Sequence, residues 1–289
     1  MGSILSCCIQ QGVAIVSSMI SQLGYNFTSS EWNTVHNSGT VTENTSTLQG
    51  SATDLSTTTE DALKGKLSKA VLICCNTYTK PSYSLGVGPL NDAITVATSM
   101  KEYGCTCYYI HNPQSNEFLK WLKFFLQNTS QYLLVYYTGH GSNMADKNSD
   151  EDDGQDECFV FDDAFVKDDV LVQSLIDNKT TNAKVVLLTD CCHSGSIWDI
   201  QGGTVNGRTI PSNIISISAA QDTQTAKQTE LNGNEQGVFT FYFYKYLSTN
   251  PSATPEQMKA DLTQYFNRFE MTYVTATTTP SYLTSKIMP

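Results

Sequence analysis

Two short segments of the chain place reactive side chains in small-residue turns directly after apolar runs. The first, YYTGHGSNM over residues 136–144, sets His140 between two glycines. The second, VVLLTDCCHSGS over residues 185–196, ends its apolar run in Cys191 and Cys192. A thiol becomes a strong nucleophile when a base removes its proton or lowers its pKa, and a nearby imidazole does this. The two segments together therefore predict a thiol nucleophile with a histidine base.

Apolar runs of strand length recur from residue 70 onward and would position these two turns. They are rich in β-branched and aromatic residues on both faces, as in strands of a buried parallel sheet, and they span residues 71–76, 105–110, 132–138, 184–190 and 214–218. Helical patterns fall between or after them, at residues 91–104, 116–127, 168–178, 239–247 and 256–266. This alternation predicts an α/β fold, a doubly wound and mostly parallel sheet with helices on both faces.

His140 and Cys192 each lie just past the carboxyl end of a predicted strand. Ligands of open α/β sheets bind at those ends, so one crevice could hold both side chains. The N–H groups near Gly141 and Cys192 could then hold the oxyanion of a substrate carbonyl. Taken singly, a buried cysteine is more often an inert small hydrophobe, and a histidine beside glycine is more often a turn or core residue. Two such turns at equivalent sheet positions favour the catalytic interpretation.

Composition narrows the class of protein. The 289 residues are 40% hydrophobic and 16% charged, which is typical of a globular protein. A formal net charge of −11 argues against a nucleic-acid partner, because such binding depends on clustered Lys and Arg. The nine cysteines form no zinc-type C-x-x-C pair, and we see no secretory signal. We therefore expect free thiols in a reducing, cytoplasmic compartment.

The first part of the chain differs from the rest. Residues 37–60 are dominated by Ser, Thr, Asn and Gly without sustained periodicity, so they are predicted to be a linker or a loosely held arm. We expect an N-terminal arm or pro-segment over residues 1–69, followed by the catalytic domain over residues 70–289.

The segments YYTGHGS and DCCHSGS, in this order on this pattern of strands, resemble the two signature segments of metacaspases, a family of caspase-like cysteine proteases. The resemblance extends from about Val71 to PSYLTS at residues 280–285. It implies a caspase-like fold in which His140 is the general base and Cys192 is the nucleophile. It also implies that Cys191 points into the core.

Carboxylates recognise basic side chains, whereas arginine recognises acidic ones. The chain has only two arginines, Arg208 and Arg268, and neither lies in the motif segments. The resemblance places Asp92 and Asp190, with a hydroxyl at Thr138, in the pocket for the residue before the cleaved bond. It therefore implies cleavage after Arg or Lys. For Asp92 an alternative is a helix N-cap.

A later segment, SISAAQDTQTAKQ over residues 216–228, resembles a family block that helps wall the substrate cleft. Asp222 fits that block, although a surface loop accounts for it nearly as well.

Acidic clusters outside the pocket resemble segments in which many metacaspases hold an activating calcium ion. Hard carboxylate oxygens suit this cation, and the candidate ligands are Asp156, Asp168, Asp169 and Asp199. Lys167 departs from the family, which commonly has a further carboxylate there, so its charge could weaken the site or mimic the metal. Acidic residues before Asp156 are also typical of a solvated loop.

The opening residues MGSILSCC fit the myristoylation pattern at Gly2, and Cys7 and Cys8 could carry palmitate. Two acyl chains are what stable membrane anchoring requires. The alternative is a chance match or a cloning remnant.

The sequence as a whole predicts a monomeric cysteine endopeptidase that acts on proteins or peptides with basic residues. By the resemblance, calcium activates it and its N-terminal arm restrains the active site. Self-cleavage is expected in loops at Lys66, Lys147 or Arg208. Two other functions stay open: a non-catalytic caspase-like scaffold, and a peptidase of the legumain or gingipain type, which shares the His-Gly turn but fits DCCHSGS less well.

Overall fold

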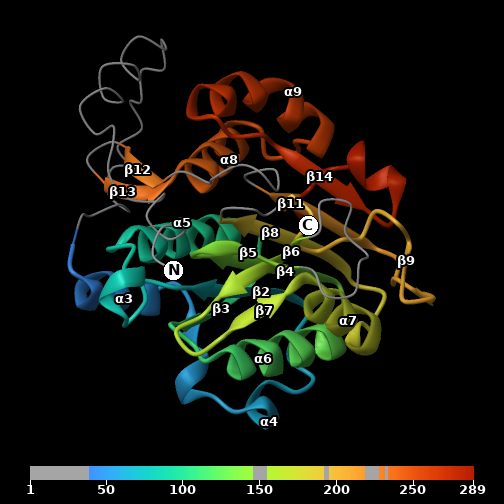
Figure 1. The fold of residues 1–289 in the computed structure, drawn as a ribbon, viewed down its shortest axis with the longest axis horizontal. Coiled ribbons are helices and arrows are strands. Elements are labelled where there is room, and N and C mark those ends of the chain that lie inside the picture. Colours follow the sequence, from blue (N-terminus) through green and yellow to red (C-terminus); the bar gives the residue numbers. More distant parts are fainter. Residues whose placement is uncertain (1–38, 146–154, 192–194, 219–227, 232–233) are drawn as a thin grey trace.

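A seven-stranded sheet lies at the centre of the computed structural model, which describes residues 39–145, 155–191, 195–218, 228–231 and 234–289. The strand order is β1-β3-β2-β4-β8-β11-β14. Neighbouring strands run parallel except β14, which pairs antiparallel with β11 at one edge. Helices cover both faces (Figure 1), so the predicted doubly wound, mostly parallel sheet is confirmed.

The strands of this sheet coincide with the apolar runs of the sequence. Their bounds are β1 Thr53–Asp54, β2 Lys69–Cys75, β3 Thr106–His111, β4 Tyr132–Thr138, β8 Lys184–Asp190, β11 Ile214–Ser218 and β14 Val274–Thr277. β4, β8 and β11 have the predicted bounds, whereas β2 and β3 are slightly shifted. β1 and β14 were not predicted, because neither has a two-sided apolar run.

Each central strand buries side chains on both of its faces. In β2, Val71 and Ile73 pack into one core cluster, whereas Leu72 and Cys74 pack into the other. Because helices cover each face, neither can be polar, and this explains the continuous rather than alternating apolar runs.

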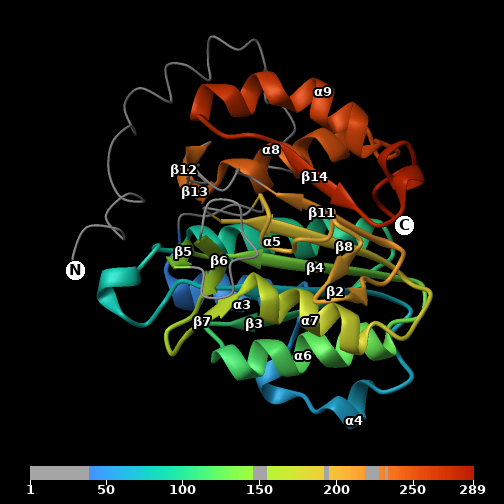
Figure 2. The same cartoon turned by 45° about the vertical axis from the view of Figure 1, so that its right-hand side comes forward.

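The helices form two layers, which Figure 2 shows from a second angle. One layer packs on the cluster containing Ile73 and consists of α3 (Val41–Gln49), α5 (Gly88–Glu102), α8 (Val238–Thr249) and α9 (Pro255–Phe266). The other packs on the cluster containing Leu72 and consists of α4 (Glu60–Leu63), α6 (Ser115–Asn128) and α7 (Asp168–Asn178). The single-turn helices are η2 (Leu55–Thr57), η3 (Pro81–Tyr83), η4 (Asn267–Phe269) and η5 (Pro280–Leu283).

The described residues also form three small antiparallel sheets that were not predicted from the sequence. One follows directly on His140 and comprises β5 (Gly141–Ala145), β6 (Gln155–Val160) and β7 (Phe165–Lys167). The others are the pairs β9 (Thr204–Val205) with β10 (Arg208–Thr209), and β12 (Gln228–Leu231) with β13 (Asn234–Gly237).

The expectation of a loose linker over residues 37–60 is wrong for the part of it that the structure describes. Thr40 and Glu43 form a capping box at the start of α3, and Leu48 of this helix is completely buried. The Asn44 side-chain amide donates to Asn91 Oδ1 of α5 at 3.0 Å. The sequence T-x-x-E carries this helix start, which a judgement from composition alone overlooks. A pro-segment role for residues 1–69 stays a prediction.

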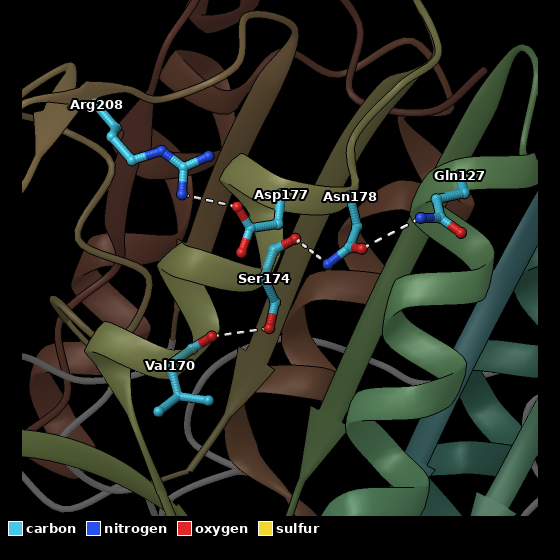
Figure 3. Close-up of polar contacts among 6 residues, drawn as sticks. All are labelled: Gln127, Val170, Ser174, Asp177, Asn178 and Arg208. Atoms are coloured by element: carbon cyan, nitrogen blue, oxygen red, sulfur yellow. Dashed lines mark hydrogen bonds and ion pairs between the residues drawn. The ribbon is translucent and has the colours of Figure 1, made fainter.

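The β9–β10 hairpin is tied to α7 by an ion pair. Arg208 Nη1 lies 2.7 Å from Asp177 Oδ1, with both side chains about half exposed (Figure 3). Water and salt screen such a pair, so its contribution to stability is small. On the same helix, Asn178 accepts from the Gln127 amide of α6 at 3.2 Å and donates to the Ser174 carbonyl at 2.9 Å. The bond from Gln127 to Asn178 joins α6 to α7.

None of the described helices has both the length and the apolar character needed to cross a bilayer.

Candidate active site

The strands that carry the two reactive turns are direct neighbours. β4 and β8 pair in parallel, and their last residues, Thr138 and Asp190, lie opposite each other in the register. His140 follows Thr138 by two residues, and the chain reaches Cys192 two residues after Asp190. Residues 192–194, including Cys192, lie outside the described residues. The chain after Thr138 and the chain after Asp190 therefore leave the sheet at the carboxyl ends of adjacent strands.

Cys191 belongs to the hydrophobic core rather than to the crevice. Its side chain is 2% exposed and packs in the cluster between the sheet and α6 and α7. This is the orientation that the sequence predicts for the first of the two cysteines.

The His140 imidazole is held from two sides and is only 4% exposed. Its Nε2 lies 2.7 Å from the carbonyl oxygen of Tyr83. Because a carbonyl can only accept, Nε2 carries the proton, and Nδ1 is the ring nitrogen with a lone pair. The ring also lies against that of Tyr78, with centroids 4.9 Å apart and planes inclined by 30°. The imidazole is thus held in one orientation by these two contacts.

Gly139 permits a close approach of the turn to its surroundings. A Cβ at this position would lie 2.8 Å from Tyr78 Oη and 3.1 Å from Asn76 Cβ. Any side chain here would push the turn away from both neighbours. The next glycine, Gly141, is the oxyanion candidate and directly follows His140. It is the first residue of β5 and pairs with Phe159 of β6.

The three pocket candidates lie together at the N-terminus of α8. Asp92 Oδ1 accepts from the Gly237 N–H at 2.8 Å, and Thr138 Oγ1 lies 3.4 Å from Asp92 Oδ2. Asp190 Oδ2 accepts from the Thr240 N–H at 3.1 Å and from the Thr240 hydroxyl at 2.7 Å. Both carboxylates therefore use the unpaired N–H groups and the positive end of the helix dipole.

Burial controls the charge of this carboxylate pair. It raises the pKa of Asp92 well above its usual range, and the neighbouring charge of Asp190 raises it further. Burial also raises the pKa of Asp190 to about 6, although the hydrogen bonds from Thr240 oppose this shift. The ionised pair is therefore costly without a cation, and a basic side chain would remove that cost.

The alternative that Asp92 caps a helix is wrong. α5 begins at Gly88 with Val87 as the cap residue, so Asp92 lies within the helix. Pro89 supplies the helix start that sequence reasoning assigned further along the chain.

The calcium candidates come from separate elements: Asp156 from β6, Asp168 and Asp169 from the first turn of α7, and Asp199 from the segment between β8 and β9. Asp168 is buried, and its two oxygens accept from the N–H groups of Glu157 at 3.0 Å and Asp169 at 2.7 Å. The Asp199 N–H donates to the Ser196 carbonyl at 2.6 Å. The Asp156 side chain lies outside the described residues. Among those described, no group of three or more His, Cys, Asp or Glu side chains could hold a metal ion.

Glu157 is a polar residue of this region that the sequence reasoning missed. Its side chain is 2% exposed and accepts from the Ser196 hydroxyl at 2.6 Å. Its position between the buried strand residues of QDECFV was the available signal, because a buried carboxylate needs partners.

The remaining residues singled out in the sequence are candidates for self-cleavage, for the substrate cleft and for acylation. Lys66 is exposed in the loop between α4 and β2. Asp222, Lys147, Gly2, Cys7 and Cys8 all fall outside the described residues.

Comparisons with known proteins identify the class to which this α/β fold belongs. The caspase domain family model matches residues 67–285, more than half of the chain, and the chain belongs to that family of cysteine peptidases. A solved protein from Geobacter sulfurreducens, GSU0716, is 20% identical with a TM-score of 0.56, covering 76% of this chain and 98% of that one. This likeness supports the fold.

The more similar curated relatives are metacaspases, as the motif resemblance implies. Metacaspase-4 of Arabidopsis thaliana is 33% identical over 73 residues, covering 25% of this chain and 18% of that protein. Metacaspase-1 of Yarrowia lipolytica is 25% identical, covering 42% of this chain and 39% of that protein. The matched segments thus span less than half the length of either relative.

A methyl group at position 237 should disrupt the carboxylate pair. The Cβ of Gly237→Ala would lie 2.2 Å from Asp190 Oδ2 and 3.0 Å from Asp92 Oδ2. We expect the substitution to lower the free energy of unfolding by about 1–3 kcal/mol, as overpacking does. Urea denaturation measures this change.

Gly202→Ala is the matched control, because its Cβ would approach its nearest neighbour, the Thr204 carbonyl, only to 3.7 Å. It should change the free energy of unfolding by less than about 0.5 kcal/mol. Equal stability of the two variants would show that the helix backbone does not press on the carboxylates.

Proposed function

We propose that the chain is a cysteine endopeptidase that cleaves peptide bonds after Arg or Lys. The observation that carries this proposal is the arrangement at one sheet edge of a buried carboxylate pair, Asp92 and Asp190, beside an oriented imidazole, His140. The carboxylates supply recognition of a cation, and the imidazole supplies a base for Cys192, which the chain reaches two residues after Asp190.

The first half of the reaction forms a thioester. His140 Nδ1 takes the proton of the Cys192 thiol while Nε2–H remains bonded to the Tyr83 carbonyl. The thiolate attacks the scissile carbonyl carbon, and the N–H groups of Gly141 and Cys192 hold the oxygen that becomes negative. The tetrahedral intermediate then breaks its C–N bond, and the imidazolium gives its proton to the leaving amine.

The second half regenerates the enzyme. Water attacks the thioester carbonyl and gives a proton to His140 Nδ1. The C–S bond breaks, the peptide leaves as a carboxylic acid, and the thiolate regains the proton from the imidazolium. The base thus moves two protons per turnover without a net change in the enzyme.

Selectivity for basic side chains follows from charge balance in the pocket. Without a cation, burial keeps a proton on the pair, since the pKa values of both Asp92 and Asp190 are raised. A guanidinium or ammonium group can replace that proton and donate hydrogen bonds to the carboxylates. An acidic side chain would meet like charge, which excludes cleavage after Asp.

The proposed activity is tested with short fluorogenic peptides that differ only in the residue before the bond. We expect cleavage after Arg and Lys, none after Asn or Asp, and no cleavage by Cys192→Ala, because that variant lacks the nucleophile. Circular dichroism of Cys192→Ala checks that it remains folded. Absence of cleavage by the parent protein above the background of Cys192→Ala would favour the scaffold alternative. Cleavage after Asn would favour the legumain type.

The pocket charge should make binding depend on pH. Because the pKa of Asp190 is raised to about 6, this carboxyl is protonated at pH 5 and must lose its proton before it pairs with a guanidinium. Affinity for an arginyl peptide should therefore rise between about pH 5 and pH 7, as Asp190 loses its proton. Calorimetry on Cys192→Ala measures this without interference from turnover.

Asp190→Asn is the matched control for this titration. It keeps the shape of the side chain but removes the carboxyl whose pKa is about 6, so the rise between pH 5 and pH 7 should flatten and binding should weaken by about 2–5 kcal/mol. Affinity independent of pH in the parent protein would argue against Asp190 as a pocket residue.

Calcium activation through Asp156, Asp168, Asp169 and Asp199 is part of the proposal, supported by the family resemblance alone. Both oxygens of Asp168 already accept backbone bonds, and Lys167 brings a positive charge to this region. We therefore assign no catalytic step to the metal.

The calcium proposal is tested by titrating the cleavage rate of an arginyl peptide with calcium and then with a chelator. We expect calcium to raise the rate and the chelator to reverse the rise, whereas magnesium, which demands a tighter octahedral site, should not substitute. A rate indifferent to the chelator would remove calcium from the account.

We also propose that the enzyme processes itself and acts as a cytoplasmic monomer. Of the predicted cleavage points, Lys66 is exposed in a loop, whereas Arg208 is in a hairpin strand and bound to Asp177. Lys66 is therefore the better candidate of these two. Acylation of Gly2, Cys7 and Cys8 would add membrane attachment.

A further inference from the structure

Two tyrosine hydroxyls, which we call the tyrosine clamp, hold the main chain of His140 to that of Val160 at the end of β6. Tyr78 Oη accepts from the His140 N–H at 2.6 Å and donates to the Val160 carbonyl at 3.0 Å. Tyr137 Oη lies 2.9 Å from the His140 carbonyl and accepts from the Val160 N–H at 3.2 Å. Tyr137 Oη also lies 3.0 Å from the Val160 carbonyl oxygen, and the Val160 N–H lies 3.2 Å from the His140 carbonyl oxygen, so the two hydroxyls reinforce a direct main-chain contact. Both polar groups of the His140 backbone are thereby bound.

The clamp is buried, so its hydroxyl groups require these bonds. Tyr137 is fully within the core and stacks on Phe159 with centroids 3.7 Å apart. Burial raises the pKa of both Tyr78 and Tyr137 well above the usual range, which keeps both hydroxyls protonated. A buried hydroxyl without a partner is costly, and phenylalanine would fill the same space without that cost. The hydrogen bonds to the main chains of His140 and Val160 therefore account for tyrosine, rather than phenylalanine, at both positions.

Tyr78 reaches this position through a backbone conformation that side chains rarely adopt. Its φ is 65°, in the left-handed region, at a cost of about 1–2 kcal/mol. Asn112 Oδ1 accepts from the N–H groups of Thr77 at 2.8 Å and Tyr78 at 2.9 Å, which stabilises the bend. Backbone strain that neighbouring groups maintain in this way is concentrated at functional sites. Here it turns the Tyr78 ring onto the imidazole of His140.

We propose that Tyr78 is a positioning residue for the peptidase reaction, whose hydroxyl fixes the His140 main chain and whose ring fixes the plane of the imidazole. The inference rests on the proposed function, because it takes His140 as the base. The hydrogen bond from Nε2 to the Tyr83 carbonyl fixes one atom of the ring but does not by itself stop rotation of the ring about its Cβ–Cγ bond. The Tyr78 ring, 4.9 Å away and inclined by 30°, blocks this rotation and keeps Nδ1 aimed in one direction.

A structural role and a positioning role predict different kinetics. A tyrosine that only stabilises the fold would lower the melting temperature and leave kcat unchanged in the folded enzyme. A positioning residue lowers kcat of the fully folded enzyme while KM is kept, because misplacement of a catalytic group by about 1 Å costs about a hundredfold in rate.

The test compares Tyr78→Phe, which keeps the ring, with Tyr78→Leu, which loses both ring and hydroxyl. At a temperature where circular dichroism shows both proteins folded, Tyr78→Phe should lower kcat about tenfold or more, with KM within about twofold. Tyr78→Leu should lose more. The control is Tyr244→Phe, a buried tyrosine of α8 whose hydroxyl has no partner among the described residues and whose loss should leave kcat unchanged.

A second readout does not need activity. The imidazole Cε1–H signal of His140, one of four histidines in the chain, is assigned by its loss in His140→Gln and followed by NMR in the Cys192→Ala background. Adding Tyr78→Phe should shift or broaden this signal, whereas adding Tyr244→Phe should not. If the parent cleaves no basic peptide, the proposed function fails, and the NMR comparison still decides whether Tyr78 orients His140. Unchanged kcat or an unchanged His140 signal in Tyr78→Phe would overturn the inference.

Discussion

The in-register parallel pairing of β4 with β8 is the constraint on which the candidate site depends. It places Thr138 beside Asp190, so the histidine turn and the chain leading to Cys192 leave the sheet side by side. Two helical layers bury this strand pair on both faces, which leaves the strands little freedom to slip. A slip of one residue would turn Asp190 into the opposite face and separate it from Asp92.

The electrostatics of the site depend on a second contact, between the sheet edge and the N-terminus of α8. Two carboxylates from distant parts of the chain are bound by N–H groups of Gly237 and Thr240. These bonds and the helix dipole offset part of the cost of burying negative charge. In the proposed function, the rest of that cost drives the acceptance of a cation. The same contact ties α5, β8 and α8 together, so the proposed recognition and the folding share one set of bonds.

The sequence predicts the sheet well because apolar runs too short for a buried helix favour buried strands, and β4, β8 and β11 have the predicted bounds. The motif resemblance supplied Asp92, Asp190 and Thr138, which lie together. Contacts made by backbone groups cannot be predicted in this way. The bonds of His140 to the Tyr83 carbonyl and of Asp92 to the Gly237 N–H depend on the path of the folded chain. The role of Tyr78 cannot be predicted in this way either, since it depends on a left-handed bend. The helix Val41–Gln49 was missed although its capping box was visible.

The most direct test of the account is to locate the thiol that reacts with an arginyl peptide carrying a chloromethyl ketone in place of the scissile bond. The chain has nine cysteines, and mass spectrometry of proteolytic fragments identifies the one whose sulfur displaces chloride. The account predicts modification at Cys192 and a rate that falls sharply in His140→Ala, because the thiolate then lacks its base. Modification at another cysteine, or an equal rate without His140, would contradict it.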